Sequence, residues 1–194
     1  AFYGCTGLTS IKIPESVISI GERAFANCIG LTSFTIPNGV TSIGMGAFAS
    51  CTGLTSIKIP ESLTSIGEWA FENCSRLNKI FISDLSAWCK ISFSDNPLSY
   101  AKHLYLNGKE ITDLVIPEDV TSIGGSAFAH CSTLTSVSIP ESVISIGSTA
   151  FIDCTGLTSV NIANSVTSIG TFAFAGCTEL KNVIIGNGVT SIGM

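Results

Sequence analysis

Cysteine is the residue type in this sequence whose spacing most suggests chemistry. Seven of the eight cysteines fall into two evenly spaced series with the same step, and a longer gap separates the series. The series are Cys5, Cys28, Cys51 and Cys74, then Cys131, Cys154 and Cys177, with Cys89 outside them. Regularly spaced thiols can bind a metal ion, form disulfides, or pack as small apolar side chains.

The spacing favours thiols that pack. Zinc sites use paired ligands such as Cys-x-x-Cys, and the sequence contains no such pair. Cysteines at equivalent positions of stacked coils would be close enough for a disulfide, but their parallel Cα–Cβ bonds are a poor starting geometry. We therefore expect buried free thiols, no metal ion and no disulfide, with a bridge or a metal ion as the alternatives. We expect Cys89 to pack beneath an irregular segment.

Catalytic chemistry finds little support in the remaining residues. The two histidines, His103 and His130, fall at unrelated positions of the repeat, and we expect His130 to be exposed. A glycine-rich phosphate loop, a metal-binding histidine pair and a nucleophile elbow are all missing from the sequence. Serine and threonine are abundant, but at fixed repeat positions that suit packing and turns. We predict that the chain is no enzyme and needs no cofactor.

Charge and hydropathy exclude two classes of partner. The formal net charge is −5, from 14 acidic and 9 basic residues, whereas nucleic-acid binding demands a basic face. The same charge argues against an anionic membrane surface. Mean hydropathy is +0.51, yet no window approaches the ~18 continuous apolar residues of a membrane span. We predict neither nucleic-acid binding nor membrane insertion within this segment.

The elements that carry the cysteines repeat with the same period. In residues 8–30, Ile11 and Ile13 alternate with Lys12, which predicts a strand with both isoleucines facing inward and the lysine outward. Pro14 has no N–H for a β-ladder and ends the strand. One such unit cannot bury its apolar side chains alone, so we expect the units to stack.

The second half of each unit supplies a further extended stretch and a turn. Residues 17–20 form the extended stretch, and Gly21 permits a tight corner. Phe25 and Cys28 have the spacing of one helical turn and share a side. Stacking predicts one aromatic row inside the array, made of Phe2, Phe25, Phe48, Phe71, Phe128, Phe151 and Phe174.

These patterns predict a single repeat array. Its fold class is a repeat solenoid, a leucine-rich-repeat-like right-handed coil of 23-residue units with short parallel strands, rich in β-structure and with short helical turns. Full units span residues 8–30, 31–53, 54–76, 111–133, 134–156 and 157–179, an irregular unit with an insert spans 77–110, and partial units span 1–7 and 180–194. Because the partial units carry no polar cap, we expect the chain to be a fragment of a longer array.

The repeated motif resembles a known family. The run Leu-Thr-Ser-Ile-x-Ile-Pro-x-x-Val-x-Ser-Ile-Gly-x-x-Ala-Phe-x-x-Cys, clearest in residues 8–28, 54–74 and 134–154, is similar to the BspA-like (Treponema-type) leucine-rich repeat. The irregular segment from Asp84 to Gly108 resembles an insert seen in such arrays. Ala163 and Gly186 depart from the pattern by replacing the strand-ending proline, which predicts a looser turn there.

The resemblance implies a location and a role. Members of this family are secreted or anchored at the surface, mostly in bacteria and some protists. They are associated with adhesion to host matrix proteins or to other cells, and they share no catalytic residues. It therefore implies an extracellular or cell-surface protein whose partner is a host or matrix protein, or another cell-surface protein.

The outward positions of the first strand are the best binding candidates. They form the set Ser10, Lys12, Ser33, Thr35, Ser56, Lys58, Lys79, Phe81, Asp113, Val115, Ser138 and Asn161. If the strands line the concave side, as solenoids commonly arrange, these residues present a polar, low-charge surface with a few bases. The alternative is serine and threonine stacking on a sheet that has no partner.

The irregular segment offers a second set of candidates. Trp88, Tyr100 and Tyr105 are aromatic residues of the kind favoured in binding hot spots, or else they form a small core of the insert. Asp84 and Asn96 are expected to cap short helices. Asn107-Gly108 predicts a hairpin. Leu104 and Leu114 are too close in sequence for their strands to be successive parallel rungs.

The sequence thus supports an adhesive, protein-binding surface module. Two rivals stay open. Near-identity of the units favours a passive structural spacer in a surface protein. Exposed aromatic residues such as Trp69 and Phe172 beside polar groups favour a carbohydrate-binding surface.

Overall fold

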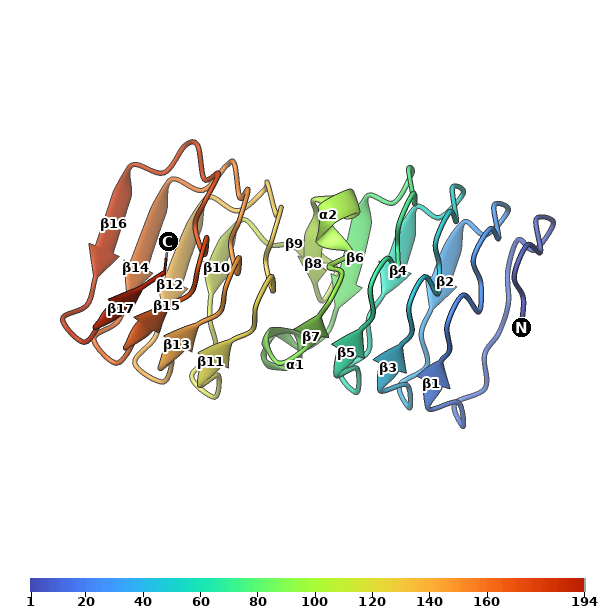
Figure 1. Cartoon of the computed structure of the whole chain (residues 1–194), viewed down its shortest axis with the longest axis horizontal. Helices are drawn as coiled ribbons and strands as arrows, with labels where there is room; N and C mark the ends of the chain where they lie inside the picture. Colours follow the sequence, from blue (N-terminus) through green and yellow to red (C-terminus); the bar gives the residue numbers. More distant parts are fainter. Residues whose placement is uncertain (194) are drawn as a thin grey trace.

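Short strands at two positions of each coil form the framework of the chain. The computed structural model describes residues 1–193 and shows a β-solenoid with few helices (Figure 1). Strands of consecutive coils pair in parallel and in register with the repeat, as in Ser33 with Ser56 and Ser136 with Ser159. The predicted solenoid of stacked, parallel strands is confirmed.

Four sheets run along the array, two in each half. The N-terminal long sheet contains β2 (Ser33–Thr35), β4 (Ser56–Lys58), β6 (Lys79–Ile82), β8 (Leu104–Leu106) and β9 (Lys109–Glu110). The C-terminal long sheet contains β10 (Asp113–Val115), β12 (Ser136–Ile139), β14 (Ser159–Ile162) and β16 (Asn182–Ile185). The N-terminal short sheet contains β1 (Ser19–Ile20), β3 (Ser42–Ile43), β5 (Ser65–Ile66) and β7 (Ser92–Phe93). The C-terminal short sheet contains β11 (Ser122–Ile123), β13 (Ser145–Ile146), β15 (Ser168–Ile169) and β17 (Ser191–Ile192).

The strands bury alternate side chains, as period two requires. In β4, Ile57 is 1% exposed while Lys58 points to solvent. The β-branched residues of successive coils lie side by side on the inner face, where stacking removes them from water. The outer face keeps the polar residues, and this separation positions the candidate binding residues.

Turns close the third side of each coil, and backbone hydrogen bonds join these turns from coil to coil. Phe25 N donates to Ala47 O and Phe48 N donates to Ala70 O, both at 2.8 Å. Two residues per turn adopt positive φ, among them the bulky Trp69 at 55°. The third side therefore has its own ladder without forming strands.

The predicted aromatic row lies inside the array. The rings of Phe25, Phe48 and Phe71 are parallel within 9°, with centroids 5.5 and 5.4 Å apart. In the second half, Phe128, Phe151 and Phe174 stack at 5.2 Å. Each buried ring contributes roughly 1.5–3 kcal/mol by leaving water, so the row stabilises the stack along its length.

The corner glycines Gly44 and Gly67 are required by close packing against the preceding coil. The φ angles of Gly44 and Gly67 are not positive; instead, a Cβ atom on Gly44 would lie 2.7 Å from the backbone N of Glu22 in the preceding coil. Close approach of coils excludes a side chain there. The looser turn predicted at Ala163 is present, because Val166 N donates to Ala163 O at 3.4 Å, compared with 3.1 Å from Val17 N to Pro14 O.

The irregular segment forms two short helices and a hairpin. Asp84 caps α1 (Leu85–Cys89) by accepting a hydrogen bond from Ala87 N at 2.9 Å, as predicted. α2 (Leu98–Ala101) follows Pro97, and Asn96 Oδ1 accepts from Leu98 N at 2.8 Å. The hairpin expected at Asn107-Gly108 joins β8 to the antiparallel β9.

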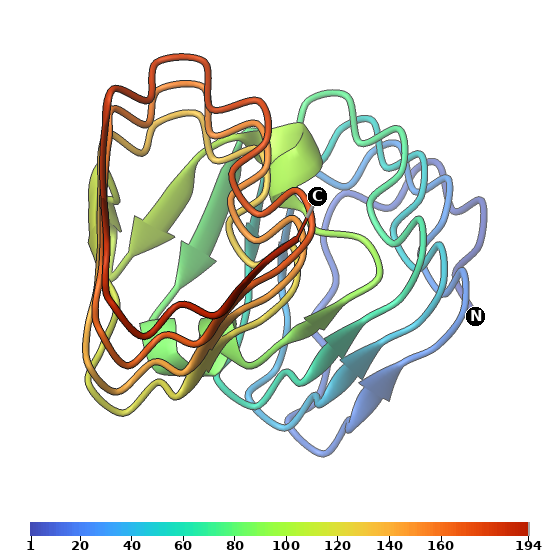
Figure 2. The same ribbon diagram turned by 60° about the vertical axis from the view of Figure 1, so that its left-hand side comes forward.

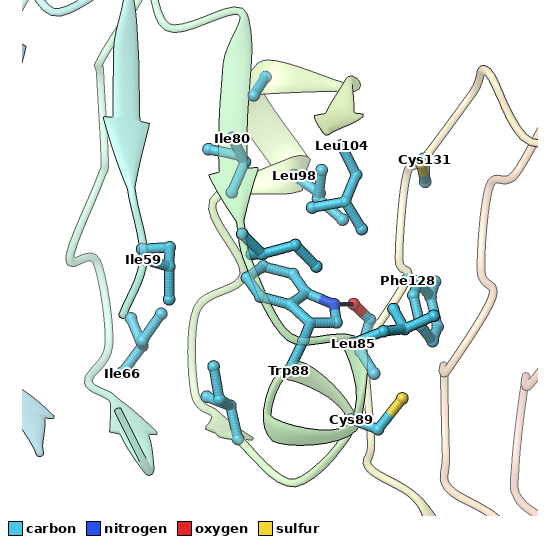
Figure 3. Packing of buried hydrophobic residues seen from close by; sticks show 14 of the residues in the cluster. Ile59, Ile66, Ile80, Leu85, Trp88, Cys89, Leu98, Leu104, Phe128 and Cys131 are labelled. Atoms are coloured by element: carbon cyan, nitrogen blue, oxygen red, sulfur yellow. Dashed lines mark hydrogen bonds between the residues drawn. The ribbon is translucent and has the colours of Figure 1, made fainter. Parts of the chain in front are cut away.

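Side chains of this segment replace the third-side ladder where it is interrupted, and Figure 3 shows Trp88 among them. Phe71 N has no alanine carbonyl in the next coil and donates to Asp95 Oδ2 at 3.3 Å. Ala127 O accepts from Trp88 Nε1 at 2.8 Å and from Asn96 Nδ2 at 3.1 Å. Trp88 is 1% exposed and lies between the isoleucines of the N-terminal coils and Phe128. The apolar core thus continues through the insert.

The two long sheets do not join. β8 pairs with β6 and β9, and β10 pairs with β12 alone among the strands of residues 1–193. Figure 2 shows that the coils before and after the insert are offset and turned relative to one another. The outward residues therefore form two separate faces, one on each long sheet.

Candidate protein-binding surface

The outer face of the N-terminal long sheet carries two parallel rows of predicted residues. Register pairs Thr35 with Lys58, Lys58 with Phe81, and Phe81 with Tyr105. The second row contains Ser33, Ser56 and Lys79. Ser10 and Lys12 are exposed at the equivalent positions of the first coil, outside the defined strands.

Four of these residues form what we term the lysine–aromatic patch: Lys58, Lys79, Phe81 and Tyr105. The rings of Phe81 and Tyr105 lie 5.1 Å apart with an angle of 38° between their planes. Lys79 Nζ lies 6.0 Å from the centre of the Tyr105 ring, within cation–π range. Both lysines are exposed and both rings are partly exposed, so the patch offers positive charge beside aromatic surface.

The outer face of the C-terminal long sheet has a different character. Its central row runs from Val115 through Ser138 and Asn161 to Ile184, with both ends more than half exposed, at 68% and 65%. Shallow grooves of about 650 and 310 Å³ flank this row. The row carries no lysine, so the two faces differ in charge.

Asp113 is the charged member of this second face. Its carboxylate accepts hydrogen bonds from Ser136 Oγ at 2.5 Å and from Thr135 Oγ1 at 3.1 Å. These hydrogen bonds, that of Ser136 foremost, lower the pKa of Asp113 and keep it ionised. The carboxylate gives the start of the C-terminal face a fixed negative charge.

The aromatic residues of the insert do not act together. The prediction of Trp88 as a contact residue is wrong, because its indole lies in the core and its N–H is bonded to backbone. Tyr100 is half-buried within the insert, where desolvation, and secondarily the Asp95 charge, raises its pKa to about 12. Tyr105 alone lies on the outer face, in the lysine–aromatic patch.

The exposed aromatic residues proposed for carbohydrate binding lie far apart along the array. Trp69 and Phe172 are 52% and 57% exposed, at equivalent corners of their coils. Ser126 and Thr149 occupy the same corner in the coils between them. The corner therefore presents isolated rings and no aromatic platform.

The cysteine ladder lies in the core except at its two ends, where Cys5 is exposed and Cys177 is partly exposed. Cys51 Sγ donates to Phe25 O at 3.1 Å, and Cys74 Sγ donates to Phe48 O at 3.2 Å. Burial raises the pKa of both thiols to about 12, so they stay protonated and unreactive at neutral pH. Cys89 is buried beneath the insert as expected, with its pKa also raised by burial to about 12. All eight sulfurs are free thiols, and Cys5 is exposed.

The histidines lie apart from one another and from the ladder. His103 Nδ1 lies 2.5 Å from Glu110 Oε1. His130, expected to be exposed, is half-buried, with Nδ1 3.4 Å from Asp153 Oδ2, and burial lowers its pKa. Residues 1–193 contain no group of three or more side chains placed to hold a metal ion. In the same range, no helix is long and apolar enough to cross a membrane.

One feature of the surface comes from the sheet break and was not predicted from residue types. A cleft of about 290 Å³ separates β9 from β10, and Lys109, Glu110 and Thr112 contribute to its lining. The only signal of this cleft in the sequence was the close spacing of Leu104 and Leu114. Their strands could not be successive parallel rungs, so strand edges had to remain unpaired there.

The sequence pattern and the fold agree with one known family. A family model described as "BspA type Leucine rich repeat region (6 copies)" matches residues 1–104 and 99–194, so it covers the whole chain. No curated protein matches the chain.

Solved structures of bacterial leucine-rich repeat proteins share the fold. The T. pallidum protein TpLRR is 27% identical with a TM-score of 0.50, over 85% of this chain and 72% of that one. A leucine-rich repeat protein from Eubacterium ventriosum is 26% identical with a TM-score of 0.52, over 90% of this chain. The pneumococcal vaccine antigen PcpA is 20% identical with a TM-score of 0.61, over 91% of this chain, and shows likeness of fold. The chain spans 58% and 50% of the latter two proteins. It belongs to the BspA-type leucine-rich repeat family.

Proposed function

We propose that this chain is a non-catalytic, protein-binding module of a secreted or cell-surface protein, and that the lysine–aromatic patch is its principal contact surface. One observation carries the proposal: Lys58, Lys79, Phe81 and Tyr105 lie together on the outer face of a rigid sheet. Aromatic residues are enriched in protein interfaces, tyrosine is enriched in binding hot spots, and positive charge steers acidic partners towards them.

The scaffold supports this role because it fixes the patch before binding. Phe81 and Tyr105 each occupy a paired strand, and their backbone is held by β4, β6, β8 and β9. A contact surface that is already ordered loses little conformational entropy on binding. The backbone of the patch therefore needs no rearrangement to receive a partner.

The proposed partner is a host or matrix protein, or another cell-surface protein, with an acidic contact region. Membership of the repeat family and the lysines of the patch support this choice. The location at a cell surface is part of the same proposal and is supported by the family resemblance.

Surface plasmon resonance tests the proposal. The chain is passed over immobilised matrix proteins, including fibronectin, and the triple variant K58A/K79A/F81A is compared with the control S138A/N161A on the other face. We expect the triple variant to lose at least tenfold in affinity and the control to change less than twofold. Absence of binding across a broad panel, or equal binding by both variants, would contradict the proposal.

A structural spacer is the second candidate function. The regular register between equivalent residues on both sides of the insert favours it, because regularly paired coils make a stiff stack regardless of their outer residues. Under this alternative, adhesion of cells that display the full-length protein should survive the triple substitution. Loss of adhesion with unchanged surface display would exclude the spacer as the sole function.

A further inference from the structure

The cleft between β9 and β10 contains an open sheet edge. In a parallel sheet, the backbone N–H and C=O of one residue point towards one neighbouring strand, and those of the next residue point towards the opposite neighbour. Ile116 N donates to Ser138 O of β12 at 3.1 Å, and Thr112 O accepts from Thr135 N at 2.7 Å. The backbone groups of Val115 therefore point the opposite way, towards the cleft.

The N-terminal long sheet, where strands pair on both sides, shows which partner β10 lacks. Phe81 occupies the position of Val115 in the N-terminal long sheet, and its carbonyl accepts from Ile59 N of the preceding coil at 2.9 Å. β10 has no preceding strand, because β9 turns back onto β8. The N–H and C=O of Val115 are thus left to solvent, at a residue that is 68% exposed.

The cleft beside this edge has an apolar floor and a charged rim. Its floor contains the aliphatic side chains of Leu85, Leu106, Ile111 and Leu114. Its volume of about 290 Å³ leaves room for a short segment only.

The rim carries charges of both signs. Lys109, Glu110 and Asp113 line it, which leaves an excess of negative charge. The carboxylate of Asp113 stays ionised because Ser136 and Thr135 donate to it. The rim therefore favours a positively charged occupant.

We propose that this cleft binds an extended peptide segment of a partner, which adds a strand to β10. Backbone groups at an unpaired edge pair readily with another strand, and this mode of recognition is common. The floor selects alternating aliphatic side chains, and the rim selects a basic residue between them. The site is separate from the lysine–aromatic patch and goes beyond the function proposed for it.

A peptide with the sequence of residues 53–59 of this chain is a suitable probe. It carries Ile57, Lys58 and Ile59, which in the intact sheet lie beside the rung equivalent to β10. A fluorescent copy should bind the chain saturably, as measured by anisotropy. A scrambled peptide of the same composition should bind at least tenfold more weakly.

Two matched variants locate the binding edge. V115P removes the free N–H of β10 that points towards the cleft. V183P removes a backbone N–H that points away from β14 on β16, the opposite edge strand of the same sheet. We expect V115P to weaken peptide binding at least tenfold and V183P to leave it unchanged. The reverse result would place the peptide at the end of the array and overturn the proposal.

Modified peptides keep the test decisive if V115P fails to fold. N-methylation at Ile59 blocks a hydrogen bond towards β10, and N-methylation at Lys58 blocks one that points away. The first should weaken binding at least tenfold and the second should not, while equal binding would contradict strand addition. The K58A/K79A/F81A chain should bind the peptide normally, which separates this site from the patch.

Discussion

Phe48 lies at the centre of the first aromatic row, with the parallel rings of Phe25 and Phe71 on either side. Its backbone N–H is bonded to Ala70, and its carbonyl accepts from the Cys74 thiol. The ring of Phe48 therefore contacts the coils on both sides, and its backbone N–H and carbonyl bond to the following coil. This arrangement explains why the repeat preserves phenylalanine and cysteine together.

Replacing Phe48 by alanine should destabilise the array strongly. The ring is fully buried, so its loss leaves a cavity between two neighbouring rings as well as removing apolar burial. We expect a cost of about 3–5 kcal/mol, measured by urea unfolding. The control F172A removes an exposed ring and should cost less than ~0.5 kcal/mol. Similar costs for the two variants would contradict an interior aromatic stack.

Asp95 makes the stability of the insert depend on pH. Burial raises its pKa from 3.8 to about 6, and the nearby Glu72 charge adds to the shift, against the opposing hydrogen bond from Phe71 N. The folded chain therefore holds a proton here more tightly than the unfolded chain. The stabilisation from this proton is fully present below pH 3.8 and is lost as pH rises to about 6.

The variant D95N should reveal this dependence. Asparagine can still accept from Phe71 N but never ionises, so it should unfold at a higher temperature than the wild type at pH 7.5. The advantage should shrink as pH falls through 6 and disappear near 4. Melting curves across this range provide the measurement. A difference that stays constant with pH would show that ionisation of Asp95 has no part in it.

At the scale of elements, the insert keeps the solenoid continuous by replacing backbone partners with side chains. Trp88 and Asn96 supply donors to Ala127 O, and Asp95 supplies an acceptor to Phe71 N. Asn96 is 3% exposed yet bonded at both its amide nitrogen and its oxygen. Buried polar groups are stable only when paired in this way.

Replacing Trp88 by phenylalanine tests this substitution of partners. The variant W88F keeps an aromatic ring but loses the hydrogen bond from Nε1 to Ala127 O. We expect a loss of about 1–3 kcal/mol in urea unfolding. The variant W69F alters an exposed ring and serves as control, with a change within ~0.5 kcal/mol. An equal effect for the two variants would contradict a buried, hydrogen-bonded indole at Trp88.

The elements were predictable where local chemistry decides them. Period-two alternation predicted the long-sheet strands, the helix cap at Asp84 was confirmed, and Asn107-Gly108 marked the hairpin. The partners of Asp95 and Trp88 were not predictable. They depend on which backbone groups the interrupted third side leaves unpaired, and this is a property of stacked coils.

The candidate site was predictable only in part. Alternation identified Lys58, Lys79 and Phe81 as outward residues of one strand position. Tyr105 lies beside Phe81 because the insert sets the register of β8 against β6. This register departs from the repeat period, so the repeat alone does not predict the pair. Burial of Trp88 likewise depends on how the insert folds back onto Ala127.

At the scale of the whole molecule, the insert divides one apolar core into two outer faces. The core is continuous from the first coils to the last, whereas the long sheets end at β9 and restart at β10. The N-terminal face carries the lysines and the aromatic pair, and the C-terminal face carries Asp113 and the grooves. One rigid body can therefore present two chemically different surfaces.

Hydroxyl-radical footprinting of the chain with and without a bound partner protein measures the central claim most directly, because it reports the exposure of individual side chains. We expect the partner to protect Phe81 and Tyr105 from oxidation and to leave Trp69 and Phe172 as reactive as in the free chain. Protection of the two corner residues, with Phe81 and Tyr105 unchanged, would contradict the assignment of the outer face as the binding surface.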